Sequence, residues 1–179
     1  MEIEKIFLET EQNQVDQTTL LMDAIIKNVI GDECAQLDDL VQKVQTALED
    51  SSSLVDSELD TLALKIPTLM YPLGTFLEAV GVKEDVAKLN KNEQYNTALQ
   101  TAAGTVDAKK GIAENESLNA SLIWTAYQRA YKIIKGKLDC ASEVLQSVKK
   151  VINHRISELT LSQRYSGAII EEDDTRRFQ

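Results

Sequence analysis

The chain has 179 residues, of which 43% are hydrophobic and 27% are charged, and its formal net charge is -10 at pH 7. This length suits one domain with appendages, and the composition excludes a chain that is disordered throughout. The acidic balance argues against nonspecific binding of nucleic acid by the molecule as a whole. Glycine and proline are scarce and helix-forming residues are plentiful, so the sequence predicts an all-α protein.

Two amphipathic helices are predicted in the N-terminal part. Apolar residues recur at helical spacing from Val15 to Ile30, and Gly31 is suited to end that helix. The same pattern predicts a second helix over 37–48. The segment "EDSSSLVDSE" that follows predicts a turn, with one of the serines at 51–53 near a helix cap.

Helix breaks are predicted in the middle of the chain. Pro67 and Pro72, with Gly74, predict a short helix, a bend and a new helix from about Leu73 to Ala79, which Gly81 interrupts. The segment "KEDVAKLNKNEQYNTALQTAA" resumes helical spacing. The segment "GTVDAKKGIAENES" has two glycines and no long apolar stripe, so it predicts a loop, with a short hairpin as the alternative.

A long amphipathic helix is predicted from about Ser117, because apolar residues then step by three or four as far as Leu159. A helix of roughly 40 residues is too long for a compact domain of this size to cover. We therefore expect a partner helix from "VAKLNKNEQY" or from another subunit, and a ring or other homo-oligomer. Gly136 within this helix predicts a close helix crossing.

The predicted organisation has three parts. Residues 1–50 hold acidic helices, residues 51–165 hold the helical bundle with its long C-terminal helix, and residues 166–179 form an acidic tail that we predict to be disordered. Charge is distributed unevenly among them. Residues 1–64 carry 15 acids and three bases, whereas residues 121–165 carry three acids and eight bases. This polarity along the chain is itself a signal of function.

Residues for catalysis or metal binding are few. His154 is the only histidine, and Cys34 and Cys140 are the only cysteines, so neither a zinc site nor a nucleophile–histidine site is indicated. "GTVDAKKG" lacks the order of a phosphate-binding loop. We expect no enzyme and no cofactor. Two free thiols, no signal peptide and no long apolar run predict a cytoplasmic location without a membrane span.

The positive charge gathers in the predicted long helix. Arg129, Lys132 and Lys135 form a stripe, and Tyr127 and Tyr131 lie among them. Cations interleaved with aromatic rings suit single-stranded nucleic acid, whose phosphates pair and whose bases stack. A second cluster contains Lys149, Lys150 and Arg155. The alternative is that these cations form a solvated face or match the acidic helices, within the chain or between subunits.

The order of these features resembles that of the UvsY-like recombination mediators of large tailed phages. The resemblance covers roughly residues 58–160, through "ELDTLALKIPTL", the helix "VAKLNKNEQYNTALQ", a glycine-containing loop and the long C-terminal helix. It implies an all-helical, ring-forming protein that binds single-stranded DNA. Such a protein helps to load a RecA-like recombinase onto strands coated by a single-strand-binding protein. That family carries basic and aromatic residues before the loop, whereas "TALQTAAG" has none; Lys109 and Lys110 are the nearest substitutes.

Two functions are therefore predicted. The first is a non-enzymatic accessory protein of phage DNA recombination or replication, which binds single-stranded DNA in the host cytoplasm. The second is a helical, oligomeric protein-interaction module that binds no DNA, such as a phage inhibitor of a host factor or an assembly component. In the second, the acidic surface imitates DNA or pairs with the basic surface of another subunit.

Overall fold

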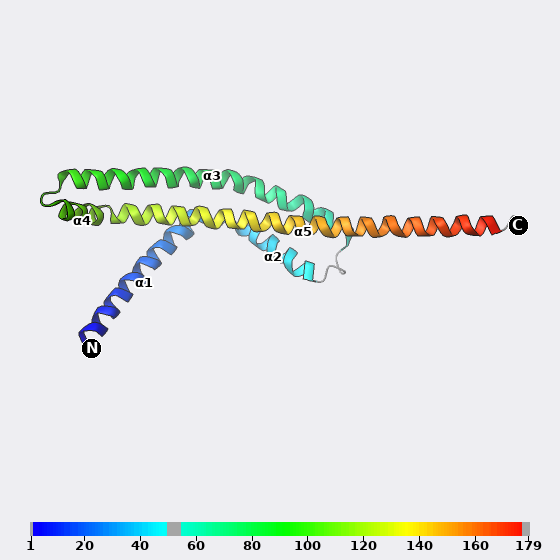
Figure 1. Ribbon diagram of the computed structural model, residues 1–179, viewed down its shortest axis with the longest axis horizontal. Helices are drawn as coiled ribbons and strands as arrows, with labels where there is room; N and C mark the ends of the chain where they lie inside the picture. Colours follow the sequence, from blue (N-terminus) through cyan, green and yellow to red (C-terminus); the bar gives the residue numbers. More distant parts are fainter. Residues whose placement is uncertain (1, 50–54, 177–179) are drawn as a thin grey trace. The chain divides into compact units, whose positions relative to one another are not determined.

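The computed structural model describes the backbone of residues 2–49 and 55–176 and the side chains of residues 12–48 and 55–163. These residues form helices and contain no strand, which confirms the all-α prediction (Figure 1). The helices are α1 (Glu2–Ile30), α2 (Ala35–Glu49), α3 (Asp56–Thr101), α4 (Val106–Glu116) and α5 (Leu118–Arg176). Two compact units are present: unit 1 comprises Met1–Gln36 and Tyr71–Leu138, and unit 2 comprises Leu37–Met70 and Asp139–Gln179.

The two predicted N-terminal helices are present, but α1 begins at Glu2, well before the predicted start near Val15. Gly31 ends α1 with a positive φ of 53°, and its N–H donates to the carbonyl of Lys27. Such a left-handed end favours glycine, which has no Cβ to clash. Helix α2 ends at Glu49 and α3 begins at Asp56, on either side of the serine-rich segment. The predicted caps at Ser51, Ser52 and Ser53 lie outside the described residues.

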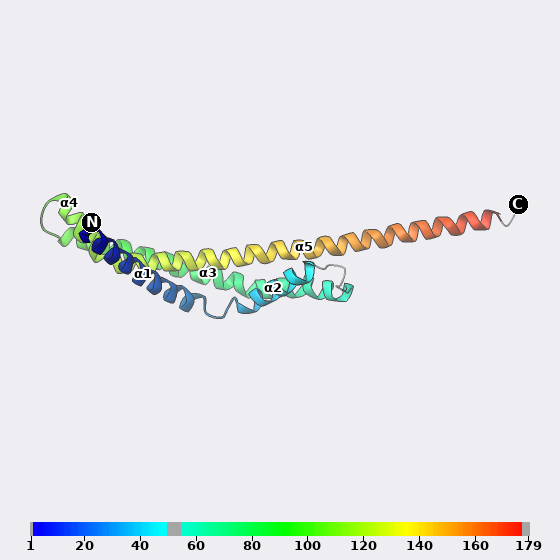
Figure 2. The same cartoon turned by 90° about the horizontal axis from the view of Figure 1, so that it is seen from below.

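The predicted breaks in the middle of the chain are wrong, because α3 continues through Pro67, Pro72 and Gly74 (Figure 2). Each proline removes one helical hydrogen bond and costs about 3 kcal/mol. Both prolines are exposed, and the neighbouring Ile66 and Leu73 are buried. Burial of such a side chain contributes about 1.5–3 kcal/mol, which offsets the cost.

The predicted loop is also wrong over most of its length, because residues 106–116 form α4. The turn occupies only 102–105, where Gly104 has a φ of 116°. Thr105 then caps α4, since its side chain accepts a hydrogen bond from the N–H of Ala108. Ala113 is fully buried and anchors the helix on unit 1. A cap and one buried contact were enough to form a helix that lacks an apolar stripe.

Helix α5 has 59 residues, so the predicted helix of about 40 residues was too short. It includes most of the 166–179 segment for which we predicted disorder, and ends at Arg176. Ala168, Glu171 and Glu172 are strong helix formers, so the helix can extend without an apolar stripe. The close crossing predicted at Gly136 is not found: apart from its own turn of helix, no atom of the described residues lies within 4 Å of the place that a Cβ would take there.

The core of unit 1 joins the C-terminal part of α3 to the N-terminal part of α5. Gly81 lies against the ring of Tyr131, whose Cε2 would be 3.3 Å from a Cβ at that position. This is the close approach that the sequence analysis assigned to Gly136. The other buried side chains are small or aliphatic: Met22, Ile26, Cys34, Leu73, Val80, Ala87, Ala98, Ala113, Ala120, Ala126, Ala130 and Ile134.

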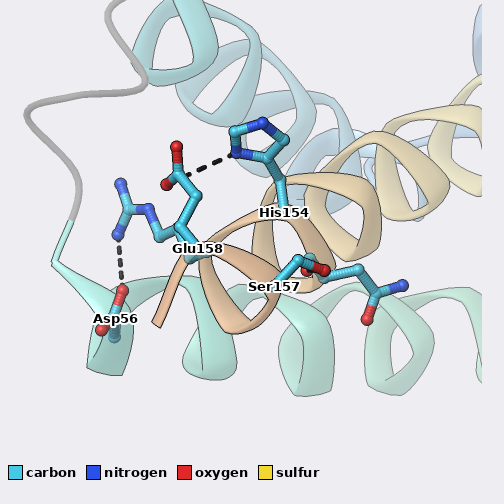
Figure 3. Close-up of polar contacts among 6 residues, drawn as sticks. Asp56, His154, Ser157 and Glu158 are labelled. Carbon is cyan, nitrogen blue, oxygen red and sulfur yellow. Dashed lines mark hydrogen bonds and ion pairs between the residues drawn. The ribbon is translucent and has the colours of Figure 1, made fainter. Parts of the chain in front are cut away.

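The core of unit 2 is built from α2, the N-terminal part of α3 and the C-terminal part of α5. Leu37 and Val44 of α2, Leu59 and Ile66 of α3, and Ala141, Val144 and Val148 of α5 are buried. An ion pair between Asp56 and Arg155 links the start of α3 to α5 in the same unit (Figure 3). Beyond this point α5 keeps apolar side chains, Ile156 and Leu159, that are exposed.

Candidate nucleic-acid and partner surfaces

The basic stripe of α5 in unit 1 consists of Arg129, Lys132 and Lys135, and all three side chains are exposed. Steps of three residues turn the helix by about 300°, so successive side chains drift by only about 60° and stay on one face. Lys132 lies about 160° around the axis from Ile134, which is fully buried. The stripe therefore faces solvent, opposite the core of its own unit.

No acidic residue occurs in α5 between Leu118 and Leu138. Acids return only at Asp139 and Glu143, which belong to unit 2. The positive potential of the stripe is thus not neutralised by neighbours on its own helix. An extended anion such as a phosphate backbone is the kind of ligand that such a stripe attracts.

The two candidate stacking residues lie partly inside unit 1. Tyr127 and Tyr131 are both half-buried. The ring of Tyr131 packs against Gly81 of α3, so part of its surface is already used for helix packing. None of the described glycines lies against Tyr127, so its ring is the better candidate of the two for a base to stack on.

The second predicted cluster falls in unit 2. Lys149 and Lys150 are exposed, whereas Arg155 is only 24% exposed and its Nη1 lies 2.6 Å from the Oδ1 of Asp56. His154 is exposed, and its Nδ1 lies 3.5 Å from the Oε2 of Glu158 (Figure 3). Arg155 is therefore held in an ion pair within unit 2. Lys149 and Lys150 are the exposed cations of this cluster.

The predicted substitutes for the basic loop lie on α4. Lys109 is half-buried and Lys110 is exposed. In the same unit, a hollow of about 510 Å³ opens between α3, α4 and the start of α5. The residues that line it are Lys91, Asn92, Tyr95, Glu114, Ser117, Leu118 and Ser121. Sequence reasoning missed this hollow, because it depends on the register between α3 and α5.

A cation–aromatic contact lies beside this hollow. The ammonium of Lys91 is 4.5 Å from the centre of the Trp124 ring, within the range of an attractive interaction. The Nε1 of Trp124 is buried and has no hydrogen-bond partner among the residues that the structure describes. The only tryptophan thus packs as part of unit 1, and its ring face is covered by a cation rather than offered to a base.

Metal-ligating clusters and membrane-spanning helices are both absent from the residues whose positions are described. Among them, no three His, Cys, Asp or Glu side chains are grouped closely enough to hold a metal ion. Within the same part of the chain, no helix combines the length and the apolar character that crossing a membrane requires.

Comparison with known proteins gives no relative: no family model, no curated protein and no solved structure matches this chain. The layout-level resemblance to UvsY-like mediators therefore stays a prediction, and any function has to be argued from the surfaces described above.

Proposed function

We propose that this chain is a non-enzymatic accessory protein of phage DNA recombination or replication that binds single-stranded DNA in the host cytoplasm. The observation that carries the proposal is the exposed, acid-free stripe of Arg129, Lys132 and Lys135 on α5. In a chain of net charge -10, such a stripe concentrates positive potential on one helix face and so gives phosphates a local site of attraction.

The role of the stripe is to neutralise phosphates, and Tyr127 supplies a ring on which a base stacks. Lys149 and Lys150 form a separate basic cluster for phosphates in unit 2, and Lys110 is a further exposed cation on α4 in unit 1. A protein that holds single-stranded DNA in this way assists the loading of a RecA-like recombinase onto strands covered by a single-strand-binding protein. That last step rests on the family resemblance.

The test is binding of a fluorescent single-stranded oligonucleotide, measured by anisotropy at two salt concentrations. One variant removes the stripe by changing Arg129, Lys132 and Lys135 to Ala. A matched control changes Lys27, Lys65 and Lys88 to Ala. These lysines are also exposed, and their replacement removes the same number of positive charges. Loss of binding only in the stripe variant supports the proposal. A wild-type chain that binds no oligonucleotide at low salt contradicts it.

A second candidate, a protein-interaction module without DNA binding, is favoured by a different observation. Helix α3 exposes Val82, Val86 and Leu89 in unit 1. Exposed apolar residues gathered on one helix face mark a protein-binding surface more often than a nucleic-acid surface. Intact assembly together with no oligonucleotide binding would favour this second function.

A further inference from the structure

Helix α3 carries two apolar stripes in unit 1, and only one of them is covered. The first contains Val80 and Ala87, which are buried in the core. The second contains Val82, Val86 and Leu89, which are exposed. At about 100° per residue these three side chains fall within about 60° of one another, on the side of the helix roughly opposite Val80. We call this second stripe the outer face of α3.

The outer face has the spacing of a two-helix seam. Ala79, Val82, Val86 and Leu89 are separated by steps of three, four and three residues. This alternation places one apolar side chain per turn on a line along the helix, as the a and d positions of a coiled coil do. The polar residues Thr75 and Glu93 lie four residues before and after this set and bound it. The apolar seam from Ala79 to Leu89 is about 15 Å long.

The charges beside the seam distinguish the two orientations of a partner helix. With Ala79 and Val86 at a positions, Glu78 and Asp85 occupy the g positions on one flank, and Lys83 occupies an e position on the other. All three side chains are exposed. In a parallel, in-register pair, a g residue faces the e residue five positions further along the partner, so Glu78 meets Lys83 of a second copy.

An antiparallel pair of the same helices has the opposite charge pattern. There the g flank of one helix meets the g flank of the other, which brings Glu78 and Asp85 against the same acids of the second copy. Like charges across such a seam are destabilising. The flanking residues therefore favour a parallel arrangement, and they favour a second copy of this chain as the partner, because its own sequence supplies the complementary charge.

We propose that a second copy of this chain docks on the outer face of α3, parallel and in register, through Val82, Val86 and Leu89. The contact is isologous, with a twofold axis along the seam. This dimer contact on α3 is separate from the proposed DNA-binding surface on α5, and its formation does not depend on DNA binding. A seam of this length is short, so the association is weak and varies with concentration.

The first experiment locates the surface by sedimentation equilibrium of the full chain. Leu89→Asp places a charge in the seam, and Leu20→Asp on α1 is the matched control. The two leucines are 68% and 69% exposed, so neither change disturbs the fold of the protomer. We expect Leu89→Asp to weaken dimerisation at least about tenfold, and Leu20→Asp to leave it unchanged. Circular dichroism confirms that both variants remain helical.

The second experiment determines the orientation by disulfide cross-linking. The exposed Cys140 is first changed to Ser, and Val82→Cys or Leu89→Cys is then introduced singly. In a parallel, in-register pair every seam residue faces its own copy, so both variants form cross-linked dimers under mild oxidation. In an antiparallel pair only one point along the seam faces itself, so at most one variant is cross-linked.

A charge exchange provides an independent measure of orientation. Glu78→Lys or Lys83→Glu alone brings like charges together across a parallel seam and weakens the dimer. The double exchange restores the pair and recovers the affinity.

Three outcomes would overturn the proposal. They are a chain that stays monomeric at the highest soluble concentration, a dimer that survives Leu89→Asp, and cross-linking at only one of the two cysteine positions. Each can occur whether or not the wild type binds single-stranded DNA, so failure here is distinguishable from failure of the proposed function.

Discussion

The carboxylate of Asp56 lies 2.6 Å from the guanidinium of Arg155, although the two residues are 99 positions apart in the sequence. Asp56 is in the first turn of α3, where a negative charge also interacts favourably with the helix dipole. The pair therefore joins the first turn of α3 to α5 in unit 2. It also removes Arg155 from the set of cations that are open to a ligand.

We predict that this pair stabilises unit 2 only slightly. Asp56 is 70% exposed, so solvent screens the interaction, and Asp56→Asn should lower the free energy of unfolding by less than about 1 kcal/mol. A double-mutant cycle with Arg155→Ala, followed by urea unfolding, measures the coupling. A coupling that does not decrease in high salt would contradict an interaction that is mainly electrostatic.

We predict that the basic stripe controls the salt dependence of DNA binding. Each phosphate neutralised on a single strand contributes about -0.7 to the slope of log affinity against log salt. Removing Arg129, Lys132 and Lys135 together should therefore flatten the slope by about 2. Lys149 and Lys150, changed to Ala, should flatten it further. Arg155→Ala should change it least, and an equal effect of Arg155 would show that its pairing with Asp56 opens on binding.

The two tyrosines should behave differently. Tyr127→Ala should cost about 1–3 kcal/mol of binding if a base stacks on its ring, with little change in the salt slope, because stacking releases few counterions. Tyr131→Ala should instead lower the stability of unit 1, since its ring packs against Gly81. Thermal unfolding and oligonucleotide binding of each variant separate the two effects. A stable Tyr131→Ala variant with lost binding would reverse these roles.

Glycines within the long helices offer a test of packing. Gly136→Ala should stabilise the chain by up to about 1 kcal/mol, because alanine is the better helix former and the added methyl group meets open space. Gly81→Ala should stabilise the chain less than Gly136→Ala does, because the added methyl group would lie 3.3 Å from the Tyr131 ring. The larger Gly81→Val should destabilise. Urea unfolding of the three variants provides the ranking.

A matched pair on α3 tests its placement in unit 2. Ile66 is fully buried, whereas Leu64, two residues earlier, is 73% exposed. Ile66→Ala should cost about 2–5 kcal/mol in the free energy of unfolding, and Leu64→Ala should change it by less than about 0.5 kcal/mol. Similar costs for both variants would mean that the helix presents a different face to its unit.

The helical class and most of the helix positions could be predicted from the sequence, because apolar spacing is a local signal. The errors came from features that depend on tertiary packing. Pro67 and Pro72 are local breakers, but burial of Ile66 and Leu73 on the same helix outweighs them. Likewise, α4 has no apolar stripe, and its formation relies on the cap at Thr105 and the burial of Ala113.

The candidate surfaces were predicted unevenly for the same reason. The stripe of Arg129, Lys132 and Lys135 follows from spacing along a single helix, so the sequence was sufficient to place these residues on one face. The pairing of Arg155 with Asp56 joins two distant helices, and no local pattern indicates it. The outer face of α3 could have been found as a second 3–4 spacing, but the predicted breaks at Pro72 and Gly81 obscured it.

The position of Trp124 makes the two units separately observable. It is the only tryptophan, and its indole is held in unit 1 beneath the Lys91 ammonium. Intrinsic fluorescence therefore follows the unfolding of unit 1 alone, whereas far-ultraviolet circular dichroism follows the helices of both units. If the two signals change together, the units melt as one cooperative block. A fluorescence change that precedes the loss of helix would assign the lower stability to unit 1.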